Sequence, residues 1–332
     1  MRQALQRAWL RRGLLAWLLL PLSGLYGAVA LLHRMLYRSG LRRSQRLPVP
    51  VVMVGNVVAG GAGKTPVVMA LLAHLRERGV AAGVVSRGYG RSGADAIEVH
   101  AGDAAQRTGD EPLLVKRSCG VPVFVAGRRA DAALALLRAY PATQVIVSDD
   151  GLQHHALARD IEVCVFDARG TGNGWLLPAG PLREAWPRPV DLVLAHGGPP
   201  GIAGHVLQRK LAAHAVRADG SRCSLGGLAS AGDIHAVAGI AQPESFFAML
   251  REAGVALAQT HALPDHHDFD AGLPLPADAT LVCTEKDAVK LWRSRPDAWA
   301  VPLQVTLPAA FIAAFDRLLD ARLSSAHGSP PA

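Results

Sequence analysis

Cysteine is scarce in this 332-residue chain, no internal repeat stands out, and the first 50 residues contain no Asp or Glu. None of the four cysteines belongs to a C-x-x-C pair, which favours small buried thiols in a reducing compartment. The same 50 residues carry nine arginines, and the rest of the chain has 26 basic and 27 acidic residues. The net charge of +8 therefore belongs to the N-terminus, which favours an anionic membrane surface and argues against a nucleic-acid partner.

An uncharged, mostly apolar run occupies residues 13–32. As a helix it would be roughly 30 Å long, enough to cross a bilayer, so the run predicts an N-terminal membrane helix. Pro21, Ser23 and Gly24 interrupt it, which leaves a kinked or re-entrant hairpin open. Residues 28–30 also resemble a signal-peptide cleavage site, but the apolar run continues past them. The larger number of arginines after the run favours a body on the cytoplasmic side.

Beyond residue 45, apolar runs alternate with helical stretches, which predicts a doubly wound, mostly parallel α/β sheet. Strands are expected at 49–54, 82–86, 121–126, 144–148, 161–167 and 190–196, and helices at 64–78, 111–118 and 128–140. Residues 168–190 are rich in Gly, Pro and Trp, which indicates a long functional loop. Residues 204–232 are interpreted as a connection. A second α/β pattern follows, with strands at 235–240, 255–260, 280–284 and 301–306 and helices at 243–253, 286–293 and 308–322.

The segment between the first strand and the first helix, residues 55–66, reads GNVVAGGAGKTP. Strand, glycine-rich turn, Lys-Thr and helix are typical of a phosphate-binding loop, in which backbone N–H groups face phosphate oxygens. Lys64 is expected to reach the β- and γ-phosphates, and the Thr65 hydroxyl to ligate Mg²⁺. Val58 replaces the usual first glycine, so the loop is nearer to variants with paired glycines. The predicted nucleotide-binding residues are Val58, Ala59, Gly60, Gly61, Ala62, Gly63, Lys64 and Thr65. A plain glycine-rich turn is the alternative.

These features divide the chain into an anchor with basic flanks at 1–45, a P-loop nucleotide-binding core at 46–228 and a smaller C-terminal α/β domain at 229–323. The tail at 324–332 is expected to be disordered.

Two acidic segments follow or open regular elements. Asp149 and Asp150 end an apolar strand, where a carboxylate can hold Mg²⁺ or its water shell, although an Asp-Asp-Gly turn is the alternative. Asp110 and Glu111 follow Thr108 at the start of a helix, which ordinary capping chemistry would explain. Both are also available as a catalytic base and a metal-shell ligand.

Histidines and cations supply further candidates. His261, Asp265, His266 and His267 could form a metal site, but adjacent positions are poorly spaced for one tetrahedral ion. A histidine that orients a carboxylate base is the alternative. Thr284 fits a capping box, which leaves Lys286 free to meet a phosphate. The remaining candidates for contact with an anionic substrate are Asn56, Arg87, Tyr89, Gln153, His154, Arg183 and Lys286. Arg128 and Arg129 are further candidates, although each alone is more simply explained as a solvated or ion-paired surface residue.

The order of the motifs is the strongest signal. They read GN at 55–56, GGAGKTP at 60–66, SRGYG at 86–90, GDEP at 109–112, DDGLQH at 149–154, LPAGPLRE at 177–184, DHH at 265–267 and TEKD at 284–287. Together they closely resemble the tetraacyldisaccharide 4′-kinases, the lipid A 4′-kinases of Gram-negative bacteria. The resemblance runs from residue 13 to about 322. Departures are small: Ala185 replaces a usual proline, and Phe269 replaces a usual tyrosine.

The resemblance implies an ATP- and Mg²⁺-dependent kinase that phosphorylates the 4′-hydroxyl of a tetraacyldisaccharide 1-phosphate, giving the 1,4′-bisphosphate lipid A precursor (lipid IVA). It implies a membrane-associated enzyme at the cytoplasmic face of the inner membrane. It makes Asp110 the catalytic base, paired with His266 or, less directly, His267, with Lys64 at the phosphates. It places Glu111, Asp149 and Asp150 near Mg²⁺. A P-loop hydrolase acting as a switch or metal-delivery factor, and a membrane-tethered scaffold without catalysis, are the alternatives. The sequence leaves the oligomeric state open.

Overall fold

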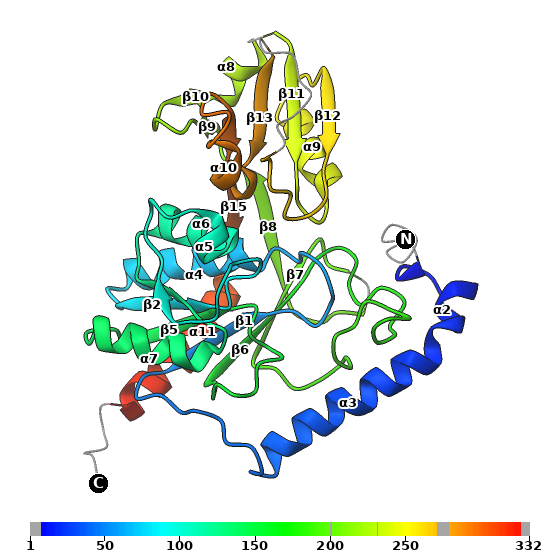
Figure 1. Cartoon of the computed structure of the whole chain (residues 1–332), viewed down its shortest axis with the longest axis vertical. Coiled ribbons are helices and arrows are strands. Elements are labelled where there is room, and N and C mark those ends of the chain that lie inside the picture. The colour runs from blue at the N-terminus through cyan, green and yellow to red at the C-terminus, as the bar shows by residue number, and fades with distance from the viewer. Residues whose placement is uncertain (1–7, 200, 231, 271–278, 327–332) are drawn as a thin grey trace.

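The computed structural model describes residues 8–199, 201–230, 232–270 and 279–326. A larger sheet forms the lower body, a smaller sheet stands above it, and two N-terminal helices run along one side of the body (Figure 1). The described cysteines are all free thiols, and two of them, Cys164 and Cys283, are buried.

The larger sheet has nine strands in the order β15-β8-β7-β6-β1-β5-β2-β4-β3. Its strands pair in parallel except at the two edges, where β3 and β15 run antiparallel to their neighbours. This confirms the predicted mostly parallel α/β sheet. The strands are β1 (Val51–Gly55), β2 (Ala82–Ser86), β3 (Ile97–Glu98), β4 (Val123–Val125), β5 (Val145–Asp149), β6 (Ile161–Phe166), β7 (Leu192–His196), β8 (His205–Leu211) and β15 (Leu303–Thr306).

Helices cover both faces of this sheet. Every residue of β1 is buried, as expected for a central parallel strand that is covered on both sides. One apolar cluster joins the sheet to α4 (Lys64–Glu77), α6 (Asp110–Cys119) and α11 (Ala309–Ala326). A second cluster joins the opposite face to α7 (Arg129–Ala139). The short helix α5 (Ala105–Thr108) precedes α6.

The smaller sheet has six strands in the order β10-β9-β14-β13-β11-β12. Its members are β9 (His214–Val216), β10 (Arg222–Ser224), β11 (Ile234–Ala238), β12 (Gln259–Ala262), β13 (Thr280–Thr284) and β14 (Trp299–Val301). The helices of this part are α8 (Leu225–Ala229), α9 (Pro243–Glu252) and α10 (Glu285–Leu291). Phenylalanines of α9 and Trp299 of β14 share its apolar core.

Several boundaries differ from the sequence prediction. The interpretation of 204–232 as a connection is wrong, because this stretch forms β8, β9, β10 and α8. Alternate residues of β8 are exposed, so the strand lacks a continuous apolar run. The expected strand at 301–306 is split at Pro302, which cannot donate to a ladder and separates β14 from β15. The predicted boundary between the core and the C-terminal domain lies between residues 228 and 229. The strands do not divide between the two sheets there, because β15 and α11, late in the chain, pack with the larger sheet.

The N-terminal segment also differs from the predicted membrane-crossing helix over 13–32. It consists of α2 (Leu14–Leu18) and α3 (Leu20–Arg38), with Pro21 in the first turn of α3. Across the described ranges, no helix combines the length and the apolar character needed to cross a membrane. At the other end, α11 extends to Ala326, and the rest of the predicted tail, 327–332, lies outside the described residues.

Candidate active site

The glycine-rich loop lies at the carboxyl edge of the larger sheet, between β1 and α4. Gly60 and Gly63 have φ angles of 95° and 72°, in the region that favours glycine. Lys64 and Thr65 form the first turn of α4, and both are largely buried. The predicted order of strand, turn and helix is therefore present, and α4 directs its N-terminal N–H groups toward the loop.

The valine at position 58, where a phosphate loop usually has its first glycine, has a local explanation. Its side chain is buried, and its backbone forms an isolated bridge with Leu182. The backbone N–H of Ala59 donates to the carbonyl of Pro181 at 2.7 Å. A valine suits this apolar contact, and Gly60 and Gly63 supply the positive φ angles of the loop. Asn56 is fully buried beneath the loop, where its amide lies 3.4 Å from the carbonyl of Gly60.

Two carboxylates meet the loop from the neighbouring strand. β5 pairs with β1, so Asp149 at its end lies beside the start of the loop. The Thr65 hydroxyl donates to Asp149 Oδ2 at 3.0 Å. The Lys64 ammonium lies 3.4 Å from Asp150 Oδ1, and the Arg183 guanidinium lies 3.1 Å from the same oxygen. The two cations counter the effect of burial and lower the pKa of Asp150.

The pKa of Asp149 is shifted in the opposite direction to that of Asp150. Burial and then the charge of Glu111 raise its pKa to about 7. Its Oδ1 atom is buried and has no hydrogen-bond partner among the described residues, while Oδ2 accepts from Thr65. A buried carboxylate oxygen with an unfilled acceptor position, beside a threonine at the start of a phosphate-loop helix, fits a magnesium ion brought by a nucleotide.

No group of three or more His, Cys, Asp or Glu side chains is placed to hold a metal within the described residues. The predicted magnesium set and the histidine cluster at 261–267 therefore do not form closed cages here. Mg²⁺ bound with nucleotide phosphates usually takes only one or two protein carboxylates and keeps waters, which Thr65 and Asp149 accommodate.

A carboxylate and a histidine from different parts of the chain meet near the loop. His266 Nδ1 lies 2.9 Å from Asp110 Oδ2, and Lys290 Nζ lies 3.3 Å from the same oxygen. The other oxygen of Asp110 accepts from the backbone N–H of Glu111 at 3.0 Å. Burial alone would raise the pKa of Asp110, but the His266 hydrogen bond and the charges of Lys286 and Lys290 lower it below its usual value.

The same contacts fix the roles of the neighbouring cations. Lys286 Nζ lies 3.2 Å from Glu111, 3.2 Å from Asp265 and 3.4 Å from His266 Nε2. Since a lysine ammonium only donates, Nε2 accepts and Nδ1 carries the proton donated to Asp110. The three carboxylate charges outweigh burial and raise the pKa of Lys286. Lys286, predicted to meet a phosphate, is engaged by protein groups in this structure.

His267, the alternative partner of Asp110, contacts its own segment instead. Its Nδ1 accepts from the backbone N–H of Phe269, and its ring packs edge-on against the Phe269 ring at 4.7 Å. The side chain of Phe269 is buried, so the hydroxyl of the usual tyrosine would not face solvent at this position. The structure thus brings His266, and not His267, to Asp110.

The capping predictions had different outcomes. Thr284 caps α10 as predicted, because its hydroxyl oxygen accepts from the backbone N–H of Asp287. Thr108 does not cap α6: the N-cap is Gly109, with a φ of 90° and no side-chain cap bond. Asp110 occupies the first helical position instead, which leaves its carboxylate free to meet His266 and Lys290.

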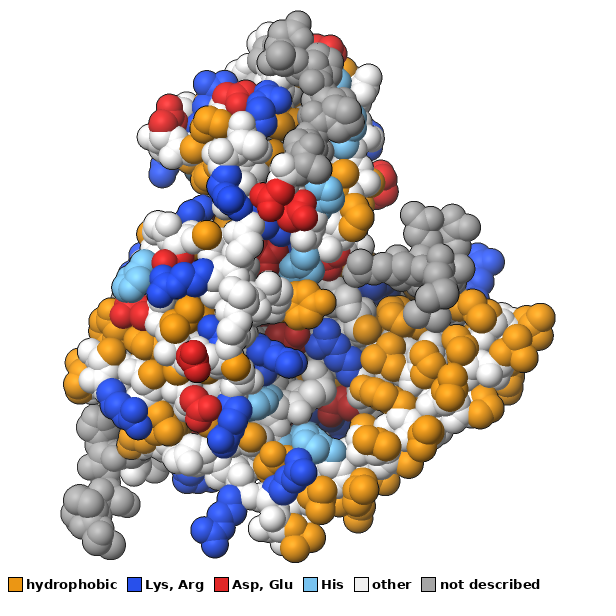
Figure 2. Space-filling model, viewed as in Figure 1, with side chains coloured by type: hydrophobic (Ala, Val, Ile, Leu, Met, Phe, Trp, Pro, Cys, Tyr) orange, Lys and Arg blue, Asp and Glu red, His pale blue; other side chains and the backbone are white. Residues whose placement is uncertain are grey.

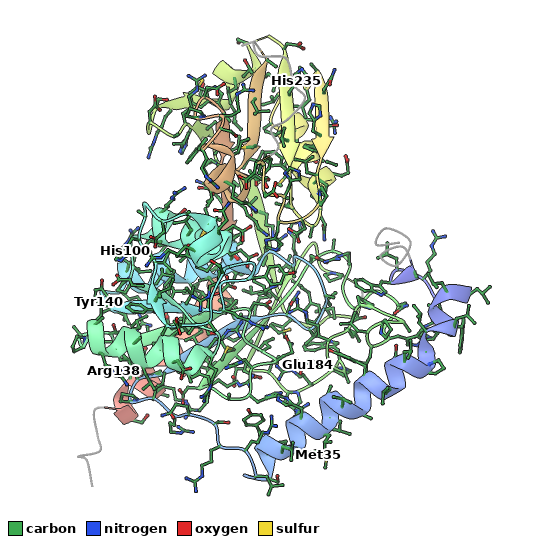
Figure 3. The ribbon with its side chains drawn as sticks, viewed as in Figure 1. Met35, His100, Arg138, Tyr140, Glu184 and His235 are labelled. Carbon is green, nitrogen blue, oxygen red and sulfur yellow. The ribbon has the colours of Figure 1, made fainter. Side chains whose placement is uncertain are left out.

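The other predicted contact residues lie at varied depths. Arg87 is exposed, and Tyr89 is exposed with its ring 4.9 Å from the His266 ring. Gln153 donates to the carbonyl of Asn56 and to Glu184. Figure 3 labels Glu184 among the loops between α3 and the larger sheet. Burial and the charge of Arg129 lower the pKa of His154 to about 4, so its imidazole is neutral at pH 7.

Three further cations lie near the site, and two of them, Arg209 and Lys290, were not anticipated. Arg129 is buried, contrary to its interpretation as a surface residue, and donates to the carbonyl of Asp150 at 2.6 Å. Arg209 of β8 donates to the carbonyl of Ala62 in the loop at 2.7 Å. Lys290 lies one helical turn beyond Lys286 on α10. Only that four-residue spacing, which places two lysines on one helix face, could have indicated its position.

These observations define a class. A parallel α/β sheet, a phosphate loop with Lys-Thr at its helix, an acidic group beside it and an Asp-His pair able to take a proton make the chain a phosphate-loop phosphotransferase.

The family follows from comparison with known proteins. The family model described as tetraacyldisaccharide-1-P 4′-kinase matches residues 15–320, and the chain belongs to this family. The tetraacyldisaccharide 4′-kinase of Acidovorax sp. (strain JS42) is 57% identical over 330 residues, covering 98% of this chain and 96% of that protein. The enzyme of the same name from Polaromonas naphthalenivorans is 55% identical over 340 residues, covering 99% of each.

A solved structure agrees with this assignment. The crystal structure of LpxK from Aquifex aeolicus, an "apo" form in complex with ATP at 2.2 Å resolution, superposes with a TM-score of 0.79. It is 27% identical in sequence and covers 92% of this chain and 100% of that one. The chain is therefore a kinase, its substrate is a lipid disaccharide, and the resemblance inferred from its motifs is confirmed.

Proposed function

We propose that the chain transfers the γ-phosphate of ATP to the 4′-hydroxyl of tetraacyldisaccharide 1-phosphate through the residues gathered at the carboxyl edge of the larger sheet. The observation that carries this proposal is the 2.9 Å contact between Asp110 on α6 and His266, which follows β12. It supplies a proton acceptor close to a phosphate loop, which a kinase needs and a nucleotide-binding scaffold does not.

The loop residues from Val58 to Gly63 present backbone N–H groups to the nucleotide, and Lys64 contacts the β- and γ-phosphates. Magnesium bound with ATP neutralises the charge that develops on the phosphates. Thr65 and Asp149 would hold it, with Glu111 and Asp150 in the surrounding shell. The ion pair between Lys64 and Asp150 at 3.4 Å keeps the lysine in place before the phosphates arrive.

The Asp110–His266 pair accepts the proton of the sugar hydroxyl. His266 donates from Nδ1 to Asp110 and thereby orients the carboxylate, while Lys290 holds the same oxygen from α10. The lowered pKa makes Asp110 a weak base. This suits a loose transition state, in which the hydroxyl loses its proton late and positioning contributes most of the rate.

The N-terminal helices are proposed to hold the enzyme at the inner membrane, with the kinase body on the cytoplasmic side. Large apolar side chains of α2 and α3 are exposed, and Figure 2 shows hydrophobic side chains gathered over these helices. They include Leu14, Leu15, Trp17, Leu18, Leu22, Leu25, Val29, Leu31, Leu32 and Met35. Such a face, with arginines close by, can lie in a lipid interface and present acyl chains to the site.

The test is a transfer assay with γ-labelled ATP and tetraacyldisaccharide 1-phosphate in detergent micelles, comparing the wild type with Lys64→Ala. Label in the lipid with the wild type alone supports the proposal. Free labelled phosphate that forms without lipid would support the hydrolase alternative. No release of label in either form would support a scaffold.

A further inference from the structure

The helix α3 has an inward face that is tied to the body by hydrogen bonds. Ser23 is buried, and its hydroxyl donates to the carbonyl of Leu176 at 2.9 Å and accepts from the N–H of Ala179 at 2.9 Å. The half-buried Tyr26 donates its hydroxyl to the carbonyl of Arg183 at 2.8 Å. All of these partners lie in residues 176–183, which we call the bridging segment.

The packing at this contact is close. A Cβ atom at Gly27 would lie 2.8 Å from Leu176 Cδ1, so α3 packs directly against the Leu176 side chain. On the other side of the helix the leucines are exposed. Ser23 and Tyr26 are therefore directed at the bridging segment, while the exposed leucines are directed away from the body.

The opposite edge of the bridging segment contacts the phosphate loop. Pro181 accepts from the N–H of Ala59 at 2.7 Å, and the N–H of Arg183 donates to the carbonyl of Val57 at 2.7 Å. The bridge between Val58 and Leu182 lies between these two bonds. The bridging segment thus lies between α3 and the phosphate loop and is bonded to both.

Arg183 extends this connection to the charged groups of the site. Its carbonyl accepts from the Tyr26 hydroxyl, and its N–H donates to the carbonyl of Val57. Its guanidinium lies 3.1 Å from Asp150. Asp150 in turn lies 3.4 Å from the Lys64 ammonium. The carbonyl and the N–H of Arg183 belong to the two peptide groups that flank its Cα, so a shift of the backbone at residue 183 would move both the loop backbone and the ion pair that positions Lys64.

We infer that Ser23 and Tyr26 are positioning residues of the kinase, which act through the bridging segment to fix the phosphate loop and Arg183 for nucleotide binding. The inference rests on the proposed role of the loop. Neither side chain belongs to the exposed apolar face of α3, so this role is separate from attachment to a membrane.

The test compares variants that remove only a hydroxyl. Tyr26→Phe and Ser23→Ala are matched with Tyr37→Phe on the same helix and Ser39→Ala at its C-cap. Among the described residues, the Tyr37 hydroxyl has no hydrogen bond, and the Ser39 hydroxyl bonds only within its own helix. Each variant is assayed for affinity for a fluorescent ADP analogue with Mg²⁺, for kcat and KM for ATP, for thermal unfolding, and for sedimentation with vesicles of phosphatidylcholine and phosphatidylglycerol.

We expect Tyr26→Phe to weaken nucleotide binding by about fivefold, the effect of one lost hydrogen bond, and Ser23→Ala, which removes two hydrogen bonds to the bridging segment, to weaken it at least as much. KM for ATP should rise similarly in each variant. Sedimentation with vesicles should match the wild type, and both control variants should match it in every assay. A merely structural contact would lower the unfolding midpoint and leave the nucleotide affinity of the folded enzyme unchanged.

Wild-type nucleotide affinity in both Tyr26→Phe and Ser23→Ala would overturn the inference, as would a change confined to vesicle binding or to the unfolding midpoint. The proposed function would survive that result, because it is tested separately by the transfer of label from ATP to the lipid.

Discussion

Replacing Asp110 with Asn removes the negative charge that His266 and Lys290 face and keeps the side-chain volume nearly unchanged. A positioned general base contributes about 10²–10⁴-fold to the rate, so kcat should fall by about that factor. The affinity for ATP should change little, because the contacts of Asp110 are made with α10 and the segment before it, not with the phosphate loop. Initial-rate measurements over a range of ATP concentrations separate the two effects.

The same substitution has a cost in stability that must be kept apart from catalysis. The side chains of Lys290 and Asp110 are 8% and 5% exposed, so they form a buried ion pair. Removing one partner of such a pair typically costs about 3–5 kcal/mol, because the remaining charge stays buried. Asn can still accept a hydrogen bond from Lys290, so we expect a loss in the unfolding free energy of about 3 kcal/mol.

The double variant Asp110→Asn/Lys290→Met provides the control. Removing the second charge should restore much of the unfolding free energy, measured by urea denaturation, but should leave kcat as low as in Asp110→Asn. If Asp110→Asn retains turnover within about tenfold of the wild type, Asp110 is not the proton acceptor. If the double variant recovers wild-type turnover, the loss in the single variant came from folding.

Two further predictions concern the metal and pH. Thr65→Val removes the hydroxyl that donates to Asp149, so the Mg²⁺ concentration for half-maximal activity should rise about 10–100-fold; an unchanged Mg²⁺ titration would remove Thr65 from the metal site. Burial and the charge of Arg159 lower the pKa of His155 to about 4. Since the unfolded chain binds a proton at this histidine near pH 6.5, the unfolding free energy is full above pH 6.5 and decreases as the pH falls toward 4. His155→Gln should therefore flatten the acid-side fall in unfolding midpoint between pH 6.5 and 4, whereas the exposed His100→Gln should not; equal slopes in both variants would contradict this assignment.

The sequence predicted the parts of the site that depend on local patterns. The loop after β1 and the acids after β5 follow buried apolar strands, and parallel strands bring their carboxyl ends to one edge of the sheet. Asp110 and His266 are 156 residues apart, and only the resemblance to a family paired them. No periodicity in a single chain reports such a contact.

The features that the sequence did not predict have separate physical reasons. Arg129 is interpreted from the sequence as a surface residue because arginine is seldom buried without a partner, and Arg209 carries no sequence signal; both are held by backbone carbonyls of the site. Strand β8 was missed because only one of its seven residues is buried. The expected strand at 301–306 covers β15 but misses the start of β14, which Pro302 separates from β15. The bridging segment is irregular, so its two sets of backbone bonds have no sequence signature.

We propose that this chain places the γ-phosphate of ATP on the 4′-hydroxyl of its lipid substrate, with Lys64 at the phosphates. The direct test is to isolate the labelled lipid formed by the wild-type protein and by Lys64→Ala, and to treat it with mild acid. Mild acid releases an anomeric phosphate and spares a phosphate ester at a sugar hydroxyl. Wild-type label that stays on the disaccharide, absent with Lys64→Ala, is the predicted result; label released by the acid, or equal label with both proteins, would contradict the account.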